Sequence, residues 1–191
     1  MDPVRRAIDD LLSSDEARAE AAVSALAGLG SAALAALHSL LASPSDETRW
    51  WAVRATAALH DEAVPGLLCA GLEDPSLEVR QAAALGLRTH PSPVAVPILT
   101  RHLADPDPLL CRLASDALAA IGEPAVPHLR EALASGAPPA GALAARALAL
   151  MKTPAAIPVL FEALDHESGL AQHWAERGLD DLGVGMVFFQ P

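Results

Sequence analysis

Apolar residues recur along this chain at helical spacing, in short segments separated by turns. The clearest segment follows Asp74-Pro75 and has apolar residues at 79, 83, 86 and 87, which lie on one face of a helix. The same pattern returns at intervals of thirty-one residues, with one slip of a single residue. The matching alanines stand at 52, 83, 114, 144 and 175. A period of this length is typical of stacked helical repeats.

A second motif, Ala-Val-Pro or Ala-Ile-Pro, alternates with the first. It stands at residues 63–65, 95–97, 125–127 and 156–158, and each copy begins another helical pattern. Two helices per period predict an all-α fold, an α-α superhelix (solenoid) of about six helical hairpins. We place the repeats at about 1–30, 31–60, 61–90, 91–122, 123–153 and 154–183, followed by an apolar tail at 184–191.

The recurring alanines should lie buried between repeats, because small side chains let helices approach to roughly 8–9 Å. The fifth repeat is the expected weak point of this packing. Ala140 stands where Val79 stands in the third repeat, and Gly141 follows it. We therefore expect a thin spot in the packing there.

Charge and composition exclude several classes of protein. The net charge of −11 argues against a nucleic-acid partner, which usually requires a basic domain. No apolar run is long enough to insert into a membrane. The first residues lack the apolar core of a signal peptide, so we expect a soluble cytoplasmic protein. Cys69 and Cys111 lack ligand or redox spacing, and we expect them to be buried as small apolar residues.

Candidate chemistry is sparse. The seven histidines lack common ligand spacing, and no serine, histidine and acid trio is suggested. His166-Glu167 is the one His-Glu pair, and it falls in an expected turn. We predict no enzyme, no catalytic residue, no metal and no cofactor.

The repeats resemble HEAT repeats, and more narrowly the short HEAT-like repeats of phycobilisome lyases. Asp74-Pro75, Val79-Arg80 and Ala83 carry the resemblance best, together with the four proline motifs. The resemblance implies that arginines at the position of Arg80 bond the aspartates of neighbouring turns in a ladder. That ladder should be partial here, because the position is held by Arg18, Arg49, Arg80, Cys111, Gly141 and Gln172 in successive repeats.

The resemblance leaves two functions open. The leading hypothesis is a non-catalytic protein–protein interaction scaffold that binds a protein partner on the concave face formed by the second helices. The alternative is a lyase-type or other protein that handles a chromophore (bilin). The di-iron site of the HEAT-like deoxyhypusine hydroxylase is not expected, because one His-Glu pair cannot build it.

Two columns on the second helices should be partly exposed. One column contains Trp50, Gln81, Arg112, Ala142 and His173, and the other contains Arg54, Leu85, Asp116, Arg146 and Arg177. Four arginines on one face of an acidic protein could select an acidic partner. We take as the partner-binding set Trp50, Arg54, Gln81, Leu85, Arg112, Arg146, His173, Arg177, Phe188 and Phe189.

Trp50→Ala and Arg146→Glu should then weaken partner association while melting stays nearly unchanged. In the opposing interpretation, Trp50 lies over its neighbouring repeat and the arginines pair with nearby acids. The next column, with Trp51, Ala82, Leu113, Leu143 and Trp174, is apolar enough to pack inside. Phe188 and Phe189 belong to the tail, which could cap the last repeat or dock on a partner or a second copy, giving a homo-oligomer.

Overall fold

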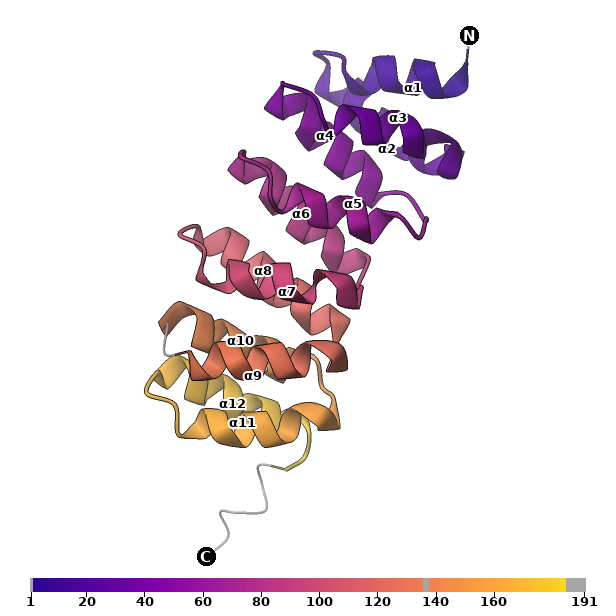
Figure 1. Ribbon diagram of the computed structural model, residues 1–191. Helices are drawn as coiled ribbons and strands as arrows, with labels where there is room; N and C mark the ends of the chain where they lie inside the picture. Colours follow the sequence, from indigo (N-terminus) through magenta and orange to yellow (C-terminus); the bar gives the residue numbers. More distant parts are fainter. Residues whose placement is uncertain (1, 136–137, 185–191) are drawn as a thin grey trace, which may run out of the picture. The chain divides into compact units, whose positions relative to one another are not determined.

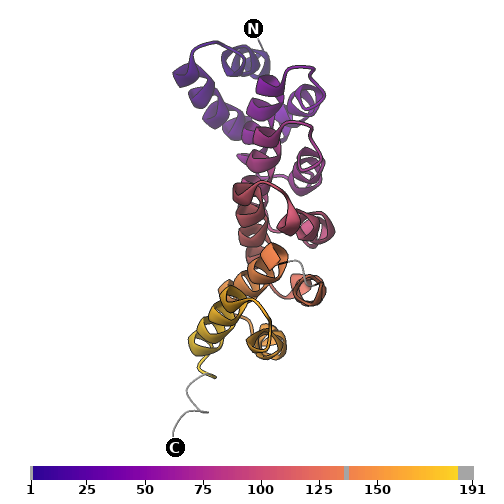
Figure 2. The ribbon, with the colours of Figure 1, turned by 90° about the vertical axis from the view of Figure 1, so that its left-hand side faces the viewer.

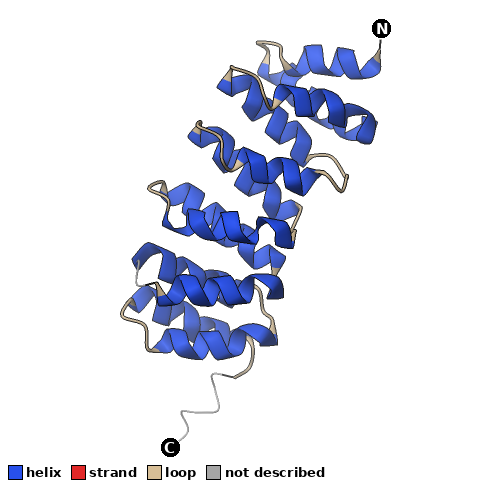
Figure 3. Ribbon diagram, viewed as in Figure 1, coloured by secondary structure: helices blue, strands red, loops and turns tan. Residues whose placement is uncertain are grey.

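The computed structural model describes residues 2–135 and 138–184. These residues form α-helices, short 3₁₀ helices and loops, and they contain no strand (Figure 3). The prediction of an all-α fold is therefore confirmed. The chain falls into two compact parts, and the boundary between them in the sequence lies between His90 and Pro91.

The N-terminal part consists of three helical hairpins (Figure 1). Their helices are α1 (Pro3–Leu11), α2 (Glu16–Leu29), α3 (Ser31–Leu40), α4 (Asp46–Ala57), α5 (Val64–Gly71) and α6 (Leu77–Thr89). Each first helix packs on the second helix that follows it, and the second helices α2, α4 and α6 contact one another in sequence. This is the stacking that the period predicts.

The C-terminal part contains three more hairpins, whose first helices begin with a 3₁₀ turn. The elements are η1 (Pro93–Ala95), α7 (Val96–Arg101), η2 (His102–Ala104), α8 (Pro108–Ile121), η3 (Glu123–Ala125), α9 (Val126–Ala134), α10 (Pro138–Leu150), η4 (Pro154–Ala156), α11 (Ile157–Leu164) and α12 (Gly169–Asp181). Figure 2 looks along the first helices of this part and shows them in a layer separate from α8, α10 and α12. None of the described helices meets the length and hydropathy that crossing a membrane requires.

Local signals in the sequence explain where the helices begin and end. Asp15 accepts hydrogen bonds from the backbone N–H groups of Ala17 and Arg18 at the start of α2, and Asp107 accepts one from Leu110 in α8. Such caps satisfy N–H groups that lack a partner within the helix. Gly122 ends α8 with φ of 78°, a left-handed conformation that glycine adopts without strain.

The recurring alanines are the core of the stack. Their relative exposure is zero, as expected, at Ala52, Ala83, Ala114, Ala144 and Ala175. At Gly178 the fit is limited by backbone, since an added Cβ would lie 2.9 Å from the Cα of Ala149. The second helices therefore approach one another more closely than any side chain at position 178 would allow.

The position of Arg80 fixes the turn of its own repeat. Arg49 donates to the carbonyl of Ser43 at 2.9 Å, and Arg80 donates to the carbonyl of Asp74 at the same distance. In later repeats the donors are shorter. Cys111 donates from Sγ to the carbonyl of Asp105 at 3.0 Å, and Gln172 donates from Nε2 to that of His166 at 2.8 Å. In each case the acceptor is the carbonyl six residues earlier. Arginine, cysteine and glutamine therefore all bond the turn of their own repeat in the same way.

The expected bond between repeats is present at Arg49. Its Nε and Nη2 atoms donate to the two carboxylate oxygens of Asp74, at 2.7 and 2.9 Å. The Arg49 guanidinium lowers the pKa of the Asp74 carboxyl, against a smaller opposing effect of burial. One rung of the ladder implied by the HEAT resemblance thus links two repeats of the N-terminal part.

Candidate functional site

Two of the predicted partner-binding residues of the N-terminal part, Trp50 and Arg54, contact each other and their neighbours. Trp50 is half-buried and meets Trp51 edge to face, with the ring centroids 4.8 Å apart. The Arg54 guanidinium carbon lies 4.8 Å from the Trp50 centroid, and Arg54 also pairs with Glu20 at 2.9 Å. The opposing interpretation therefore describes Arg54 correctly, since its charge is already neutralised by a neighbouring acid.

The surroundings of Trp50 do not suit an acidic partner. The cavity beside it is lined by Trp50, Asp46, Glu47, Ser76 and Glu78. Three carboxylates next to the indole would repel an approaching carboxylate. On α6, Gln81 is half-buried and Leu85 is 46% exposed.

The C-terminal part contains the candidate site, which we call the second-helix groove. It has a volume of about 700 Å³ and is lined by Asp105, Pro106, Pro108, Cys111, Arg112, Pro139, Ala142, Leu143, Arg146, Ser168, Leu170 and Trp174. The lining comes from α8, α10 and α12 and from the loops before α8 and α12. Two predicted residues, Arg112 and Arg146, therefore meet in one groove.

Arg146 lines this groove and is held in place by its own contacts. Its Nη1 atom lies 2.7 Å from the carboxylate of Asp116 and donates to the hydroxyl of Ser115 at 3.1 Å. Ser115 is fully buried and in turn donates to the carbonyl of Leu143 at 2.9 Å. The Arg146 side chain is only 14% exposed. A residue held in this way orients its neighbours rather than reaching out to a partner.

Trp174 is the aromatic residue of the groove. The guanidinium carbons of Arg146 and Arg177 lie 5.6 and 5.5 Å from its ring centroid, within the range of cation–π attraction. Its neighbour His173 also meets the ring edge to face, at 5.9 Å. Of these residues, Arg177 and His173 are exposed, and Trp174 is half-buried.

Two expectations about exposure are wrong in the C-terminal part. Ala142 is buried, with 5% exposure, although its column was expected to be partly exposed. Trp174 was expected to pack inside, but it lines the groove, whereas Trp51 at the same repeat position is buried. Because α12 is the last described second helix, no further second helix among the described residues covers its outer side.

Leu170 was missed by the partner-binding set, although it is 57% exposed and lines the groove. A signal was present in the sequence. The same repeat position holds glutamate at 47 and 78 but leucine at 109 and 170, and Leu109 is also 50% exposed. An exposed position that changes from acid to leucine along the array marks a surface suited to contact.

Asp105, the acidic residue that lines the groove, interacts with residues close to it in the sequence. Asp105 accepts a hydrogen bond from the backbone N–H of Asp107 at 2.9 Å, and its other oxygen lies 3.4 Å from Nδ1 of His102. Burial is the main cause that raises the pKa of the Cys111 thiol, so this floor residue is neutral near pH 7. Arg112 is exposed and has no ion pair among the residues that the structure describes.

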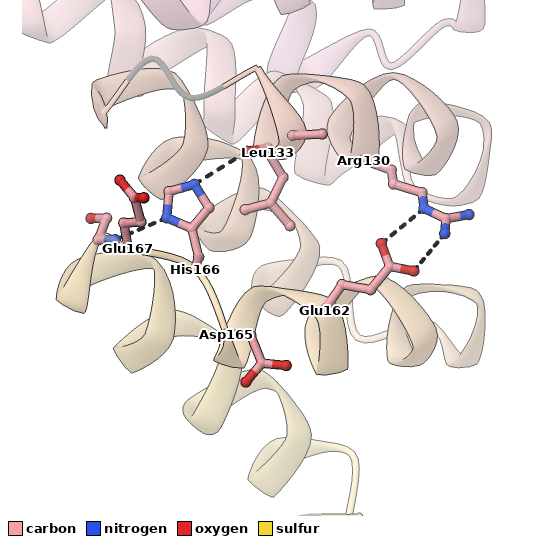
Figure 4. Close-up of a pocket in the computed structure, with 8 residues that line it drawn as sticks. Arg130, Leu133, Glu162, Asp165, His166 and Glu167 are labelled. Atoms are coloured by element: carbon pink, nitrogen blue, oxygen red, sulfur yellow. Dashed lines mark hydrogen bonds and ion pairs between the residues drawn. The ribbon is translucent and has the colours of Figure 1, made fainter.

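A second cavity lies on the side of the first helices, and we call it the first-helix cavity. It has a volume of about 680 Å³ and is lined by residues of α9, α11 and the turn after α11 (Figure 4). Arg130 crosses it and binds both carboxylate oxygens of Glu162, at 2.8 and 2.6 Å. This pair is well exposed, so it adds little to stability.

His166 closes one end of the first-helix cavity. Its Nδ1 atom accepts a hydrogen bond from the backbone N–H of Ser168 at 3.0 Å, so the proton must sit on Nε2. Nε2 then donates to the carbonyl of Leu133 at 3.2 Å (Figure 4). Both ring nitrogens of the His166-Glu167 pair are therefore used, and the described residues contain no group that could hold a metal ion.

The thin spot expected at Gly141 is filled by this histidine. A Cβ added at Gly141 would lie 2.8 Å from Nε2 and 3.0 Å from Cε1 of His166. Ala140 is also buried, with 5% exposure. Phe188 and Phe189, and the two interpretations of the tail, lie outside the described residues.

Two family models match the chain. The model described as HEAT repeats matches residues 64–140, and the model described as PBS lyase HEAT-like repeat matches residues 142–166. A comparison with proteins of curated function found no match.

Several solved structures share the fold. A designed armadillo repeat protein in complex with the peptide (KR)4 has a TM-score of 0.58 and 20% identity, with 95% of this chain and 100% of that chain covered. The complex of CpcE and CpcF of phycocyanin lyase from Nostoc sp. PCC7120 contains a chain with a TM-score of 0.59 and 23% identity, with 69% of this chain and 89% of that chain covered. Human deoxyhypusine hydroxylase in complex with glycerol has a TM-score of 0.54 and 22% identity, covering 94% and 73%. At these identities the likeness shows an armadillo/HEAT repeat fold.

Proposed function

Since the chain is a HEAT-repeat protein that carries a PBS lyase HEAT-like repeat, we propose that it is a non-catalytic scaffold that binds another protein. The observation that carries this proposal is the second-helix groove. Apolar side chains, a half-buried tryptophan and an arginine without an ion pair among the described residues line it together. Tryptophan and arginine are enriched among the residues that dominate the energy of protein interfaces.

The shape of the groove fits an extended segment of a partner. It crosses three neighbouring second helices, and helices pack about 8–10 Å apart. A ligand that crosses from α8 to α12 therefore spans about 16–20 Å, which is about five or six extended residues at about 3.3 Å each. The designed armadillo protein of similar fold is bound to a peptide, which supports this mode of binding.

The absence of catalysis is part of the proposal. Three side chains near the two cavities that could do chemistry are used in structural bonds: His166 and Cys111 bond backbone groups, and Asp105 bonds its own loop. Each of these groups would have to abandon such a bond before it could act on a substrate.

Selection of displayed random peptides against the whole chain tests the proposal. Selected peptides should bind the wild-type chain and lose binding to Leu170→Glu, because that change places a charge on the exposed apolar rim of the groove. Val94→Glu is the matched control: Val94 is 64% exposed but lies in η1, outside the groove. If no selected peptide distinguishes Leu170→Glu from Val94→Glu, the groove is not the binding site.

A chromophore-handling role is the second candidate. The PBS lyase HEAT-like repeat and the likeness to a chain of the phycocyanin lyase complex favour it. An arginine beside an apolar floor could also hold a carboxylate-bearing bilin. Mixing the chain with a bilin and recording the absorbance spectrum separates the two candidates, because a scaffold for proteins should leave the spectrum unchanged.

A further inference from the structure

We infer that the segment bound in the second-helix groove carries an acidic side chain, which binds Arg112, and an apolar side chain about five residues away, which packs on Leu170. This inference rests on the proposed function and specifies the chemistry of the partner. It follows from the exposed charge of Arg112, the exposed apolar surface of Leu170, and the distance between these two residues.

Among the described residues, the ion pairs of the groove leave Arg112 without an acidic partner. Arg146 shares its charge with Asp116 at 2.7 Å, and Asp105 is engaged by the amide of Asp107 and by His102. Arg112 is exposed and has no ion pair within the described ranges. A guanidinium at the edge of a groove presents several N–H donors that a carboxylate can accept in pairs. An acidic side chain is therefore the ligand group that completes this site.

The helix N-termini around the groove also favour an acidic ligand group. The groove lies at the N-terminal ends of α8 and α12, to which Pro108 and Ser168 contribute. Helix N-termini carry partial positive charge and favour an anion nearby. A lysine or arginine in the ligand would meet this field and the charge of Arg112 together, so basic segments should be rejected.

The apolar contact lies on the other side of the groove. Leu170 is 57% exposed on α12, with Leu143 and Trp174 lining the groove beside it. Arg146 and Arg177 both lie near the Trp174 ring, which holds the indole in place before any ligand arrives. A preformed apolar surface of this kind needs little reorganisation on binding.

The spacing of the two contacts follows from the fold. Arg112 is on α8 and Leu170 is on α12, with α10 between them. Two interhelical steps of about 8–10 Å correspond to about five extended residues. The inferred ligand is therefore a short extended motif, with its acidic and apolar side chains about five positions apart.

The peptide selection described above, read out by sequencing, is the first test. Peptides that depend on the groove should be enriched in aspartate or glutamate about five positions from a leucine, isoleucine or phenylalanine. If groove-dependent peptides appear but are neutral or basic, this inference is wrong while the proposed function stands. If no groove-dependent peptide appears, the proposed function itself fails.

The second test is a double-mutant cycle with one selected acidic peptide. Replacing its acidic residue by the neutral amide should weaken binding to the wild-type chain about tenfold, as should Arg112→Gln. On the Arg112→Gln chain the same peptide change should have no further effect. Arg88→Gln, an exposed arginine of α6, makes the same charge change outside the groove and should leave affinity unchanged. Equal losses on the wild-type and Arg112→Gln chains would show that the acid does not bind Arg112.

Discussion

Gly141→Ala should destabilise the C-terminal part, although alanine is the better helix former. Gly141 lies inside α10, where the exchange by itself favours the helix by about 1 kcal/mol. The new Cβ, however, would stand 2.8 Å from Nε2 and 3.0 Å from Cε1 of His166. Atoms cannot remain that close, so the ring must move.

The cost of moving the ring can be worked out from its hydrogen bonds. His166 is held between two backbone groups, the carbonyl of Leu133 and the N–H of Ser168. Each such bond contributes about 0.5–1.5 kcal/mol, and overpacking costs about 1–3 kcal/mol. After the gain in helix propensity, we expect a net loss of about 1–2 kcal/mol.

A double-mutant cycle isolates the contact between the two residues. In a His166→Ala background the ring is gone, so Gly141→Ala should now stabilise the chain by about 0.5–1 kcal/mol. Urea denaturation followed by circular dichroism at 222 nm measures all four proteins. The coupling energy expected between the two positions is then about 1.5–3 kcal/mol.

If Gly141→Ala stabilises the chain equally with and without the His166 ring, the imidazole does not lie against Gly141. An introduced ion pair gives an independent check. Residues 141 and 166 are as far apart in the sequence as Arg49 and Asp74, which form an ion pair between repeats. Combining Gly141→Arg with His166→Asp should create the same pair, so the double variant should be more stable than either single variant.

The remaining predictions concern stability. From the sequence, Arg146→Glu was expected to leave melting nearly unchanged, but the structure predicts a cost of about 2–4 kcal/mol, because the change sets a carboxylate against Asp116 in a half-buried site; a parent-like melting temperature would contradict this. Thr56→Val should stabilise the chain by about 1 kcal/mol in urea denaturation, because the fully buried hydroxyl has no hydrogen-bond partner among the described residues. The folded pKa of Asp74 is lowered by Arg49, so this pair stabilises the fold above about pH 4 and the contribution is lost as the pH falls through the folded pKa. Between pH 5 and pH 2 the wild-type chain should therefore lose more stability than Asp74→Asn, as measured by urea titrations at each pH.

The repeat period was enough to predict the architecture. Small residues recur only where two helices touch, so the buried alanines could be placed from spacing alone, and all five are buried. The same logic led to a wrong expectation at Gly141. Spacing shows that a side chain is missing there, but it does not show that His166, in the turn of the next repeat, occupies the space.

The turn bonds show why residue identity predicted less than position. The sequence suggested that the arginine ladder ends where arginine gives way to Cys111 and Gln172. Both residues nevertheless donate to a carbonyl six residues earlier, as Arg49 and Arg80 do. A turn carbonyl needs only one donor at the right place, so a thiol or an amide can serve. The bond to a neighbouring aspartate does require the reach and charge of arginine.

The site was harder to predict because its charges depend on neighbouring repeats. Arg54 and Arg146 share a repeat position, and each pairs with an acid on the preceding second helix, Glu20 and Asp116 respectively. These two acids do not share a repeat position, so the period alone could not identify the pairs. Two of the four arginines of the predicted stripe are thereby neutralised. What remains in the second-helix groove is Arg112, whose column neighbours differ in every repeat, and Leu170, at a position where the second and third repeats carry glutamate. In a repeat protein, residues that keep the period build the stack, so the residues that break it on an exposed face are where a binding site should be sought.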